Sequence, residues 1–138
     1  MRFFEKVKDG GANSPVDAYV LIEIKSLFSI MVLHFNPGYR EALHSHAFNA
    51  FTIWLWGEAF EVFDTWGKSD RVWWPGFMKF TPRSLFHRYV SFRGAWALTF
   101  RGPWHDTWEE RCSDGRTVTL THGRKAIAVR FAPTEEEA

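Results

Sequence analysis

The stretch PGYREALHSHAFNAFTIWLWGEAF, residues 37–60, contains two histidines that are one residue apart and precede a long aromatic run. Side chains two residues apart on a β-strand lie on the same face, about 6 to 7 Å apart at the backbone. If this segment is extended, the imidazoles of His44 and His46 point to the same side and can share a metal ion. Surface histidines also form such pairs by chance, so the rest of the sequence has to decide between the two interpretations.

The apolar runs on either side of this stretch are short and rich in β-branched and aromatic residues, and turn residues interrupt them roughly every 8 to 12 positions. No stretch of a dozen residues keeps a helical period, so helix should be minor. The pattern predicts an all-β protein whose strand edges are hidden by closure into a barrel or a two-sheet jelly roll. The predicted strands are residues 19–24, 28–35, 50–56, 59–63, 78–81, 87–92 and 96–100.

The chain of 138 residues, 46% of them apolar, suits one domain with a buried core. We expect a single domain over residues 1–138, with its core at about 17–104. Residues 116–121 and 126–131 flank the turn HGRK and predict a C-terminal β-hairpin over about 116–131. The acidic residues 133–138 are expected to be a disordered tail.

The formal net charge is +1 and no block of Lys and Arg stands out, so the composition argues against nucleic acid as a partner. Cys112 is the only cysteine, which excludes an intrachain disulfide and is typical of a cytosolic protein. The N-terminal residues lack the apolar stretch of a signal peptide, and no segment reaches the roughly 18 apolar residues of a membrane span. We expect a cytoplasmic protein with no membrane partner.

Two sequence motifs favour the metal-binding interpretation of the histidine pair. In the first, five residues separate Gly38 from His44, one separates His44 from His46, three separate His46 from position 50, and six separate position 50 from Gly57. This spacing resembles the first cupin motif, G-x5-HxH-x3-E-x6-G. Residues 76–91 resemble the second motif, G-x5-PxG-x2-H-x3-N, with matches at Gly76, Pro82 and His87. The chain is also similar to small single-domain cupins of bacteria and phages. The resemblance covers residues 17–104 and implies the cupin-type double-stranded β-helix, a jelly-roll barrel.

Three positions depart from the motifs. Ser84 replaces a glycine, so the turn at this position must either avoid a positive φ or bear the modest energetic cost of one. Ser91 replaces an asparagine that is not usually a metal ligand in cupins. Ala50 stands where cupins commonly carry a glutamate ligand, and its methyl group cannot bind a metal.

The ligand set that the resemblance implies is then His44, His46 and His87, similar to the three-histidine sites of thiol, diketone and gentisate-type dioxygenases. Three neutral ligands leave the full charge of a divalent ion uncompensated, so the ion attracts an anionic or chelating substrate. The resemblance favours Fe(II), while Zn, Ni, Cu or Mn are also open to imidazole ligation.

Three further residues are candidates for substrate binding. Tyr89 shares a strand face with His87 and could offer its hydroxyl to a bound substrate as a catalytic group; core packing is the alternative. Ala50 leaves room beside the metal. Trp54 lies four residues further along the same strand, so its side chain is on the same face as Ala50 and could form the pocket wall. His105 is expected in an exposed loop, with a pocket lid or a proton donor as the alternative, and His34 and His122 are expected to be strand and turn residues.

We therefore expect a metal-dependent enzyme of the three-histidine Fe(II) dioxygenase type that acts on a small molecule. The competing interpretations are a non-catalytic module that binds a sugar or nucleotide between aromatic walls, and a decayed site whose histidines only fill the barrel.

Residues 51–56 are apolar on both faces, whereas a barrel wall needs one apolar face. Either the second sheet and the hairpin cover the outer face or a second subunit does, and we expect a homodimer.

Overall fold

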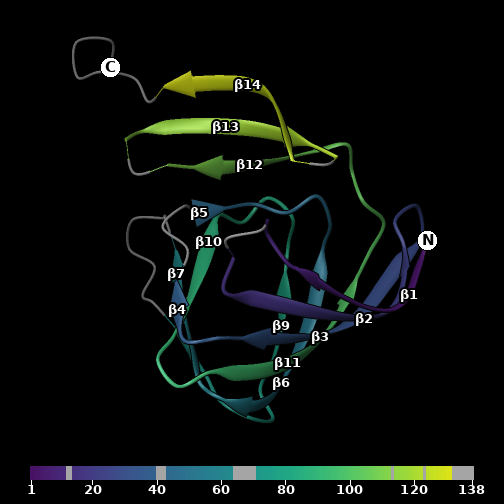
Figure 1. Ribbon diagram of the computed structural model, residues 1–138. Coiled ribbons are helices and arrows are strands. Elements are labelled where there is room, and N and C mark those ends of the chain that lie inside the picture. Colours follow the sequence, from purple (N-terminus) through teal and green to yellow (C-terminus); the bar gives the residue numbers. More distant parts are fainter. Residues whose placement is uncertain (12–13, 40–42, 64–70, 113, 123, 132–138) are drawn as a thin grey trace.

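The computed structural model describes residues 1–11, 14–39, 43–63, 71–112, 114–122 and 124–131. Strands and turns make up this described part, which contains no helix, and the strands form two antiparallel sheets that face each other (Figure 1). No described segment forms a helix with the length and apolar character needed to cross a membrane. The predicted disordered tail, residues 133–138, lies outside the described residues.

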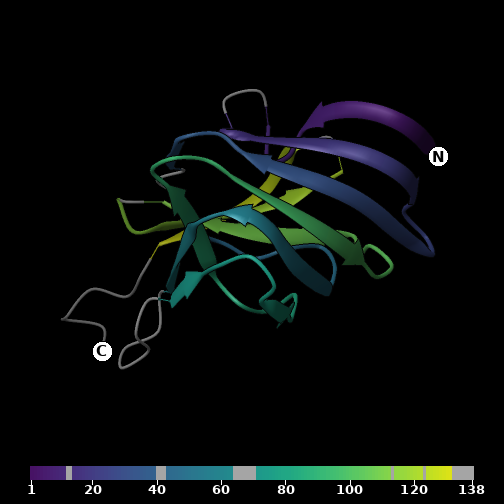
Figure 2. The same ribbon diagram turned by 90° about the horizontal axis from the view of Figure 1, so that it is seen from below.

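The first sheet has six strands, and Figure 2 shows them side by side from β1 to β9. Its centre joins strands that are far apart in the sequence, because β11 pairs with both β3 and β6. In spatial order the strands are β1 (Arg2–Lys8), β2 (Val16–Ile24), β3 (Phe28–Phe35), β11 (Ala95–Arg101), β6 (Ala50–Gly57) and β9 (Met78–Thr81).

The second sheet carries the histidines and continues into the C-terminal strands. In spatial order it contains β14 (Lys125–Phe131), β13 (Arg116–Thr121), β12 (Thr107–Arg111), β5 (Leu43–His44), β10 (His87–Ser91), β7 (Ala59–Phe63) and β8 (Arg71–Trp73), while β4 (Gly38–Tyr39) also pairs with β10. Strands that are distant in sequence again alternate at the centre, as a jelly roll requires. The prediction of a jelly-roll barrel with a C-terminal hairpin is confirmed.

The core lies between the sheets and follows the two-residue period of the strands. In β6, Ala50, Thr52 and Trp54 are buried while Phe51 and Leu55 are exposed, so the inner face was predicted correctly. Trp54 packs against the rings of Phe35 and Tyr89, at centroid distances of 5.4 and 5.5 Å. The buried apolar cluster comprises Val16, Ala18, Val20, Met31, Leu33, Phe35, Trp54, Ala59, Ala95 and Ala97.

The hairpin does not cover the outer face of β6. Strands β13 and β14 pair with each other, and β12 joins them to β5, so all three extend the second sheet. The sequence did not predict β12, because its residues TWEER are half-buried and mostly charged, nor β1, whose residues are almost all exposed. Both strands form through backbone pairing with a neighbour rather than through an apolar pattern.

Candidate metal centre

Three imidazoles from two strands and a loop converge at one end of the barrel. One ring nitrogen from each of His44, His46 and His87 can be chosen so that all three atoms lie within 4.8 Å of one another. The ring centroids form a nearly equilateral triangle, with separations of 4.9, 5.0 and 5.1 Å. His44 and His87 are opposite each other on the paired strands β5 and β10, and both are buried. The structure thus brings together the three histidines that the motifs selected.

The route by which His46 joins the cluster differs from the prediction. We expected His44 and His46 to share one strand face, but β5 ends at His44. Beyond His44 the backbone is held by other segments: the Ser45 amide donates to the Glu109 carbonyl and the His46 amide donates to the Arg83 carbonyl, at 2.8 and 3.3 Å. His46 therefore reaches the cluster from a loop held by two distant segments.

The donor set fits a divalent metal ion. The Nε2 atoms of His46 and His87 are 2.8 Å apart. Two nitrogens bound to one ion at about 2.0–2.1 Å and at right angles would be about 2.9 Å apart, so the observed spacing, which is also that of a hydrogen bond between the two rings, is compatible with two neighbouring ligands. Imidazole nitrogen suits Zn, Cu, Fe and Ni, and the geometry does not select among them.

Glu61 lies behind His87 and was missed by the sequence analysis. It is 0% exposed, and its Oε2 atom is 2.5 Å from Nδ1 of His87. The Trp73 indole N–H donates to its Oε1 atom at 3.0 Å, and the Lys79 ammonium donates to Oε2. The sequence did contain a signal for it: Glu61 is the one acidic residue in the apolar strand AFEVF, and it lies two residues from the buried Ala59, on the same strand face.

These contacts determine which nitrogen of His87 can bind a metal. Burial acts to raise the pKa of Glu61, but the hydrogen bond from His87, the charge of protonated His87 and then the charge of Lys79 outweigh it and hold the pKa at about 2. An ionised carboxylate can only accept hydrogen bonds, so His87 must donate from Nδ1. In the neutral form of His87, which is the form that binds a metal, the lone pair is then on Nε2, the atom that faces His46. Glu61 thus orients the His87 ring in the way that partners of metal-bound histidines commonly do.

Lys79 balances the charge of Glu61 inside the barrel. Burial lowers the pKa of Lys79 from its ordinary value, against the opposing effect of the Glu61 carboxylate. Its ammonium group lies 5.3 Å from the ring centre of Trp73 and 5.4 Å from that of Tyr89. Because both charges are buried and paired, removal of either one alone would leave the other uncompensated.

Tyr89 lines the cavity next to His87, with 5.0 Å between the ring centroids. Burial and then the charge of the Glu61 carboxylate, together with a hydrogen bond to that carboxylate, raise its pKa well above the ordinary value, so the hydroxyl is neutral. Its catalytic role stays a prediction.

The three histidines open onto a cavity of about 410 Å³, within the usual range for small-molecule sites. Ala50 and Thr52 line it, whereas Trp54 is a core residue outside its lining, and the predicted substrate contact of Trp54 stays untested.

Ser84 adopts no positive φ, so it fits its turn without strain. Ser91 accepts a hydrogen bond from the Gly94 amide and donates one to the Glu58 carbonyl, so it ties two loops together.

The other histidines lie apart from the cluster. His105 is exposed, as expected for a loop residue, and its backbone amide donates to the Ala47 carbonyl at 2.6 Å. His34 stacks on Trp96, and His122 stacks on Trp104.

Comparison with solved structures identifies the architecture. A sugar phosphate isomerase of the cupin superfamily from Silicibacter pomeroyi matches with a TM-score of 0.64 and 16% identity, over 97% of this chain and 94% of that chain. The DMSP lyase DddQ from Ruegeria pomeroyi matches with a TM-score of 0.55 and 23% identity, over 64% of this chain and 47% of that chain. HppE in its Fe(II) form matches with a TM-score of 0.56 and 15% identity, over 70% of this chain and 55% of that chain.

Comparison of the sequence with protein-family models and with curated proteins gave no match. The structural likeness establishes that the chain has the cupin fold, in two antiparallel sheets. The cluster of His44, His46 and His87 fits the three-histidine variant of that fold and could bind a divalent metal ion.

Proposed function

We propose that this chain is a metal-dependent enzyme of the three-histidine oxygenase type, which acts on a small molecule in the barrel cavity. The observation that carries the proposal is the triangle of imidazoles, with the Nε2 atoms of His46 and His87 at the spacing of two ligands of one ion. The solved Fe(II) form of HppE, which shares the fold, supports Fe(II) as the ion we favour.

A bound divalent ion would supply Lewis acidity and, if it is Fe(II), the means to activate oxygen. The chain would supply the rest. Glu61 holds the proton of His87 on Nδ1, away from the ligand atom. Ala50 leaves space at the position where a carboxylate ligand would otherwise lie. Tyr89 lines the cavity with a neutral hydroxyl, whose hydrogen bond with Glu61 connects it to the carboxylate behind His87.

The first experiment measures metal content. Protein purified without added metal should contain nearly one equivalent of a divalent ion, and alanine at His44, His46 or His87 should reduce it sharply because each removes a ligand. His34→Ala is the matched control, since His34 stacks on Trp96 outside the cluster, and it should retain the metal. Unchanged metal content in His87→Ala would refute the site, because His87 is the ligand from the second motif.

The second experiment measures oxygen uptake by the iron-loaded protein with thiols, diketones and aromatic diols. Uptake that is lost in His87→Ala supports the oxygenase. The alternative is a binding module, favoured by the aromatic rings of Phe48, Trp104 and Trp108 that line the cavity. A metal-free protein that binds sugars or nucleotides without any turnover would support that module and contradict the enzyme.

A further inference from the structure

We propose that Arg101 forms a second subsite in the cavity, which binds the anionic group of the substrate independently of the metal. The inference rests on the proposed function, because it places the substrate in the same cavity, and it adds the substrate class: a small organic anion that carries a carboxylate or a phosphate. Four features of the cavity lead to this assignment.

The first feature is the position of Arg101 in the sheet. Arg101 is the last residue of β11, is 5% exposed and lines the cavity. Its Cα partner on β6 is Ala50, whose own partner on β9 is Thr81. Directly paired residues on one face have Cβ atoms about 4.5–5.5 Å apart, so Arg101 is next to the position that lacks a carboxylate ligand. With alanine there, no acidic side chain at that position competes for the guanidinium.

The second feature is the distance from Arg101 to the metal site. The guanidinium carbon lies 4.5 Å from the ring centre of Phe48, and the Phe48 ring stacks on His46 with a centroid distance of 5.1 Å and an interplanar angle of 25°. One aromatic ring therefore separates the guanidinium from a metal ligand. A molecule lying along Phe48 can place its anionic group at Arg101 and a donor atom at the three histidines.

The third feature is unused hydrogen-bonding capacity. Asp9 accepts from the terminal nitrogens of Arg101, at 2.6 Å for Nη2 and 3.4 Å for Nη1. The described residues provide no acceptor for the buried Nε of Arg101 or for the buried Nε1 of Trp104, and both residues line the cavity. A buried N–H without an acceptor is unfavourable, so a small shift that lets an anion accept from these groups would be favoured.

The fourth feature is the charge around the cavity. Among the described residues that line it, five are cationic (Arg2, Lys8, Lys25, Arg101 and Arg124) and three are acidic (Asp9, Glu23 and Glu110). Arg101 is the buried one among the five cations. Charge is screened least where water is excluded, so Arg101 contributes most to the attraction of an anion.

The test titrates the full-length protein, stripped of metal by a chelator, with benzoate and with phenyl phosphate, while NMR records the amide shifts. Benzyl alcohol is the neutral probe of similar shape. Both anions share the proposed chemistry, and their relative affinities distinguish a carboxylate site from a phosphate site. We expect one or both anions to bind, with shifts around Arg101 and Phe48, and benzyl alcohol to bind at least tenfold more weakly.

Three variants separate anion binding from a structural ion pair. Arg101→Gln should weaken anion binding at least tenfold, because a charged donor is lost. Asp9→Asn should leave binding unchanged or strengthen it, because it frees the guanidinium. Trp104→Phe keeps the ring, removes the N–H and should weaken binding severalfold, which provides a test if Arg101→Gln does not fold.

Equal loss of anion binding in Arg101→Gln and Asp9→Asn would overturn the proposal, because it would indicate a merely structural ion pair. Binding that occurs only in the zinc-loaded protein would also overturn it, because the anion would then be held by the metal. Arg101-dependent binding in a protein that never holds metal would support the subsite and contradict the proposed function, so the two failures are distinguishable.

Discussion

Glu61 illustrates how one buried side chain can set the geometry of a candidate metal ligand on another strand. Its carboxylate accepts hydrogen bonds from His87, Trp73 and Lys79, all inside the barrel. Because these donors surround it, the carboxylate stays ionised and the proton of His87 stays on Nδ1. The affinity of the site for metal should therefore depend on a residue that is not a ligand.

The double change Glu61→Gln with Lys79→Met tests this dependence. It removes both members of the buried ion pair, which avoids leaving one charge unpaired, and replaces the anionic acceptor with a neutral one. We expect metal affinity to fall by about 10–100-fold, as for other partners of metal-bound histidines. In the metal-free protein, the nitrogen NMR signals of His87 should show a protonated Nδ1 in the wild type and a less uniform tautomer in the double variant.

Trp73→Phe alone is the matched control. It removes one neutral hydrogen bond to Oε1 of Glu61 but leaves Lys79 and His87 on Oε2, so His87 keeps its orientation and metal affinity should be retained. Equal metal affinity and equal NMR signals in the single and double variants would mean that Glu61 supports only the packing of the barrel.

At the scale of the elements, the pairing of β6 with β11 depends on the glycine that ends the first motif. Gly57 has a φ of 78°, and a Cβ atom placed on it would lie 2.1 Å from the Gly94 carbonyl oxygen and 2.8 Å from the Ala95 Cα atom. Both contacts are with backbone atoms, so no side chain can move to relieve them. The motif thus contains a glycine because two strands approach closely at that point.

Gly57→Ala should therefore destabilise the protein much more than Gly76→Ala. Gly76 also has a positive φ, 90°, but an added Cβ would meet no atom within 4 Å. Gly76→Ala should cost about 1–2 kcal/mol from backbone strain alone. Gly57→Ala adds the clash, so its melting temperature should be lower than that of Gly76→Ala by at least about 3 °C, measured by calorimetry. Equal melting temperatures would show that β6 and β11 can separate without cost.

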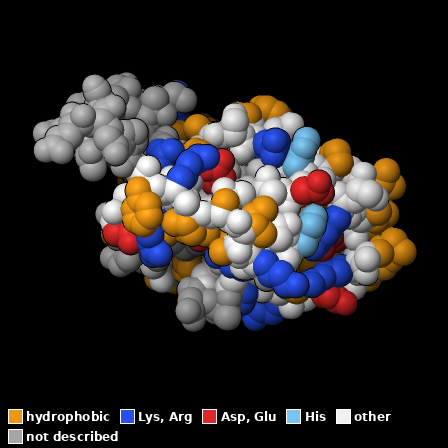
Figure 3. Space-filling model, turned by 90° about the horizontal axis from the view of Figure 1, so that it is seen from above, with side chains coloured by type: hydrophobic (Ala, Val, Ile, Leu, Met, Phe, Trp, Pro, Cys, Tyr) orange, Lys and Arg blue, Asp and Glu red, His pale blue; other side chains and the backbone are white. Residues whose placement is uncertain are grey.

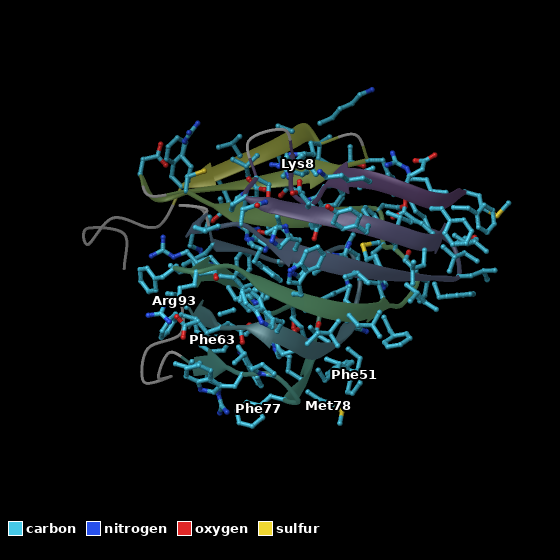
Figure 4. All side chains as sticks on the ribbon, turned by 60° about the horizontal axis from the view of Figure 1, so that its bottom comes forward. Lys8, Phe51, Phe63, Phe77, Met78 and Arg93 are labelled. Carbon is cyan, nitrogen blue, oxygen red and sulfur yellow. The ribbon has the colours of Figure 1, made fainter. Side chains whose placement is uncertain are left out.

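At the scale of the whole molecule, one outer face is apolar. The outward positions of β6, β9 and β11 are Phe51, Ile53, Leu55, Met78, Phe80, Trp96, Leu98 and Phe100, none of them charged. Phe51 is 39% exposed and Phe80 62%. Figure 4 shows Phe51, Phe77 and Met78 pointing away from the ribbon at this edge. On the opposite side, around β14, charged side chains of both signs lie among the apolar ones (Figure 3).

We propose that a second copy of the chain covers this apolar face, because the hairpin extends the other sheet instead. Light scattering at micromolar concentration should give twice the chain mass of 16.2 kDa. Phe80→Lys should give the single-chain mass, since a charge at the interface would lose its water. Ile127→Lys, an exposed position on β14, is the control and should stay dimeric. A monomeric wild type would contradict the proposal.

The sequence by itself determined the strands that show an alternating pattern and the three histidines. Residues 28–35, 59–63, 78–81 and 116–121 were predicted with the observed bounds, because side-chain alternation and turn chemistry act over a few residues. The histidines could be selected because the motif spacings count residues along the chain. Strands β1 and β12 were not predicted, because they lack an apolar pattern of their own. The two- and three-residue strands β4, β5 and β8 were not predicted either, because they are too short to show an alternating pattern.

Only the tertiary structure decided what surrounds those histidines. Glu61 meets His87 across β7 and β10, Arg101 meets Asp9 over a separation of 92 residues, and His46 reaches the cluster from a loop rather than a strand. Each of these contacts depends on which strands pair at long range and in which register, and local propensity does not encode that choice. The three clustered histidines could therefore be found by spacing, whereas the residue that orients His87 and the proposed anion subsite required the folded chain.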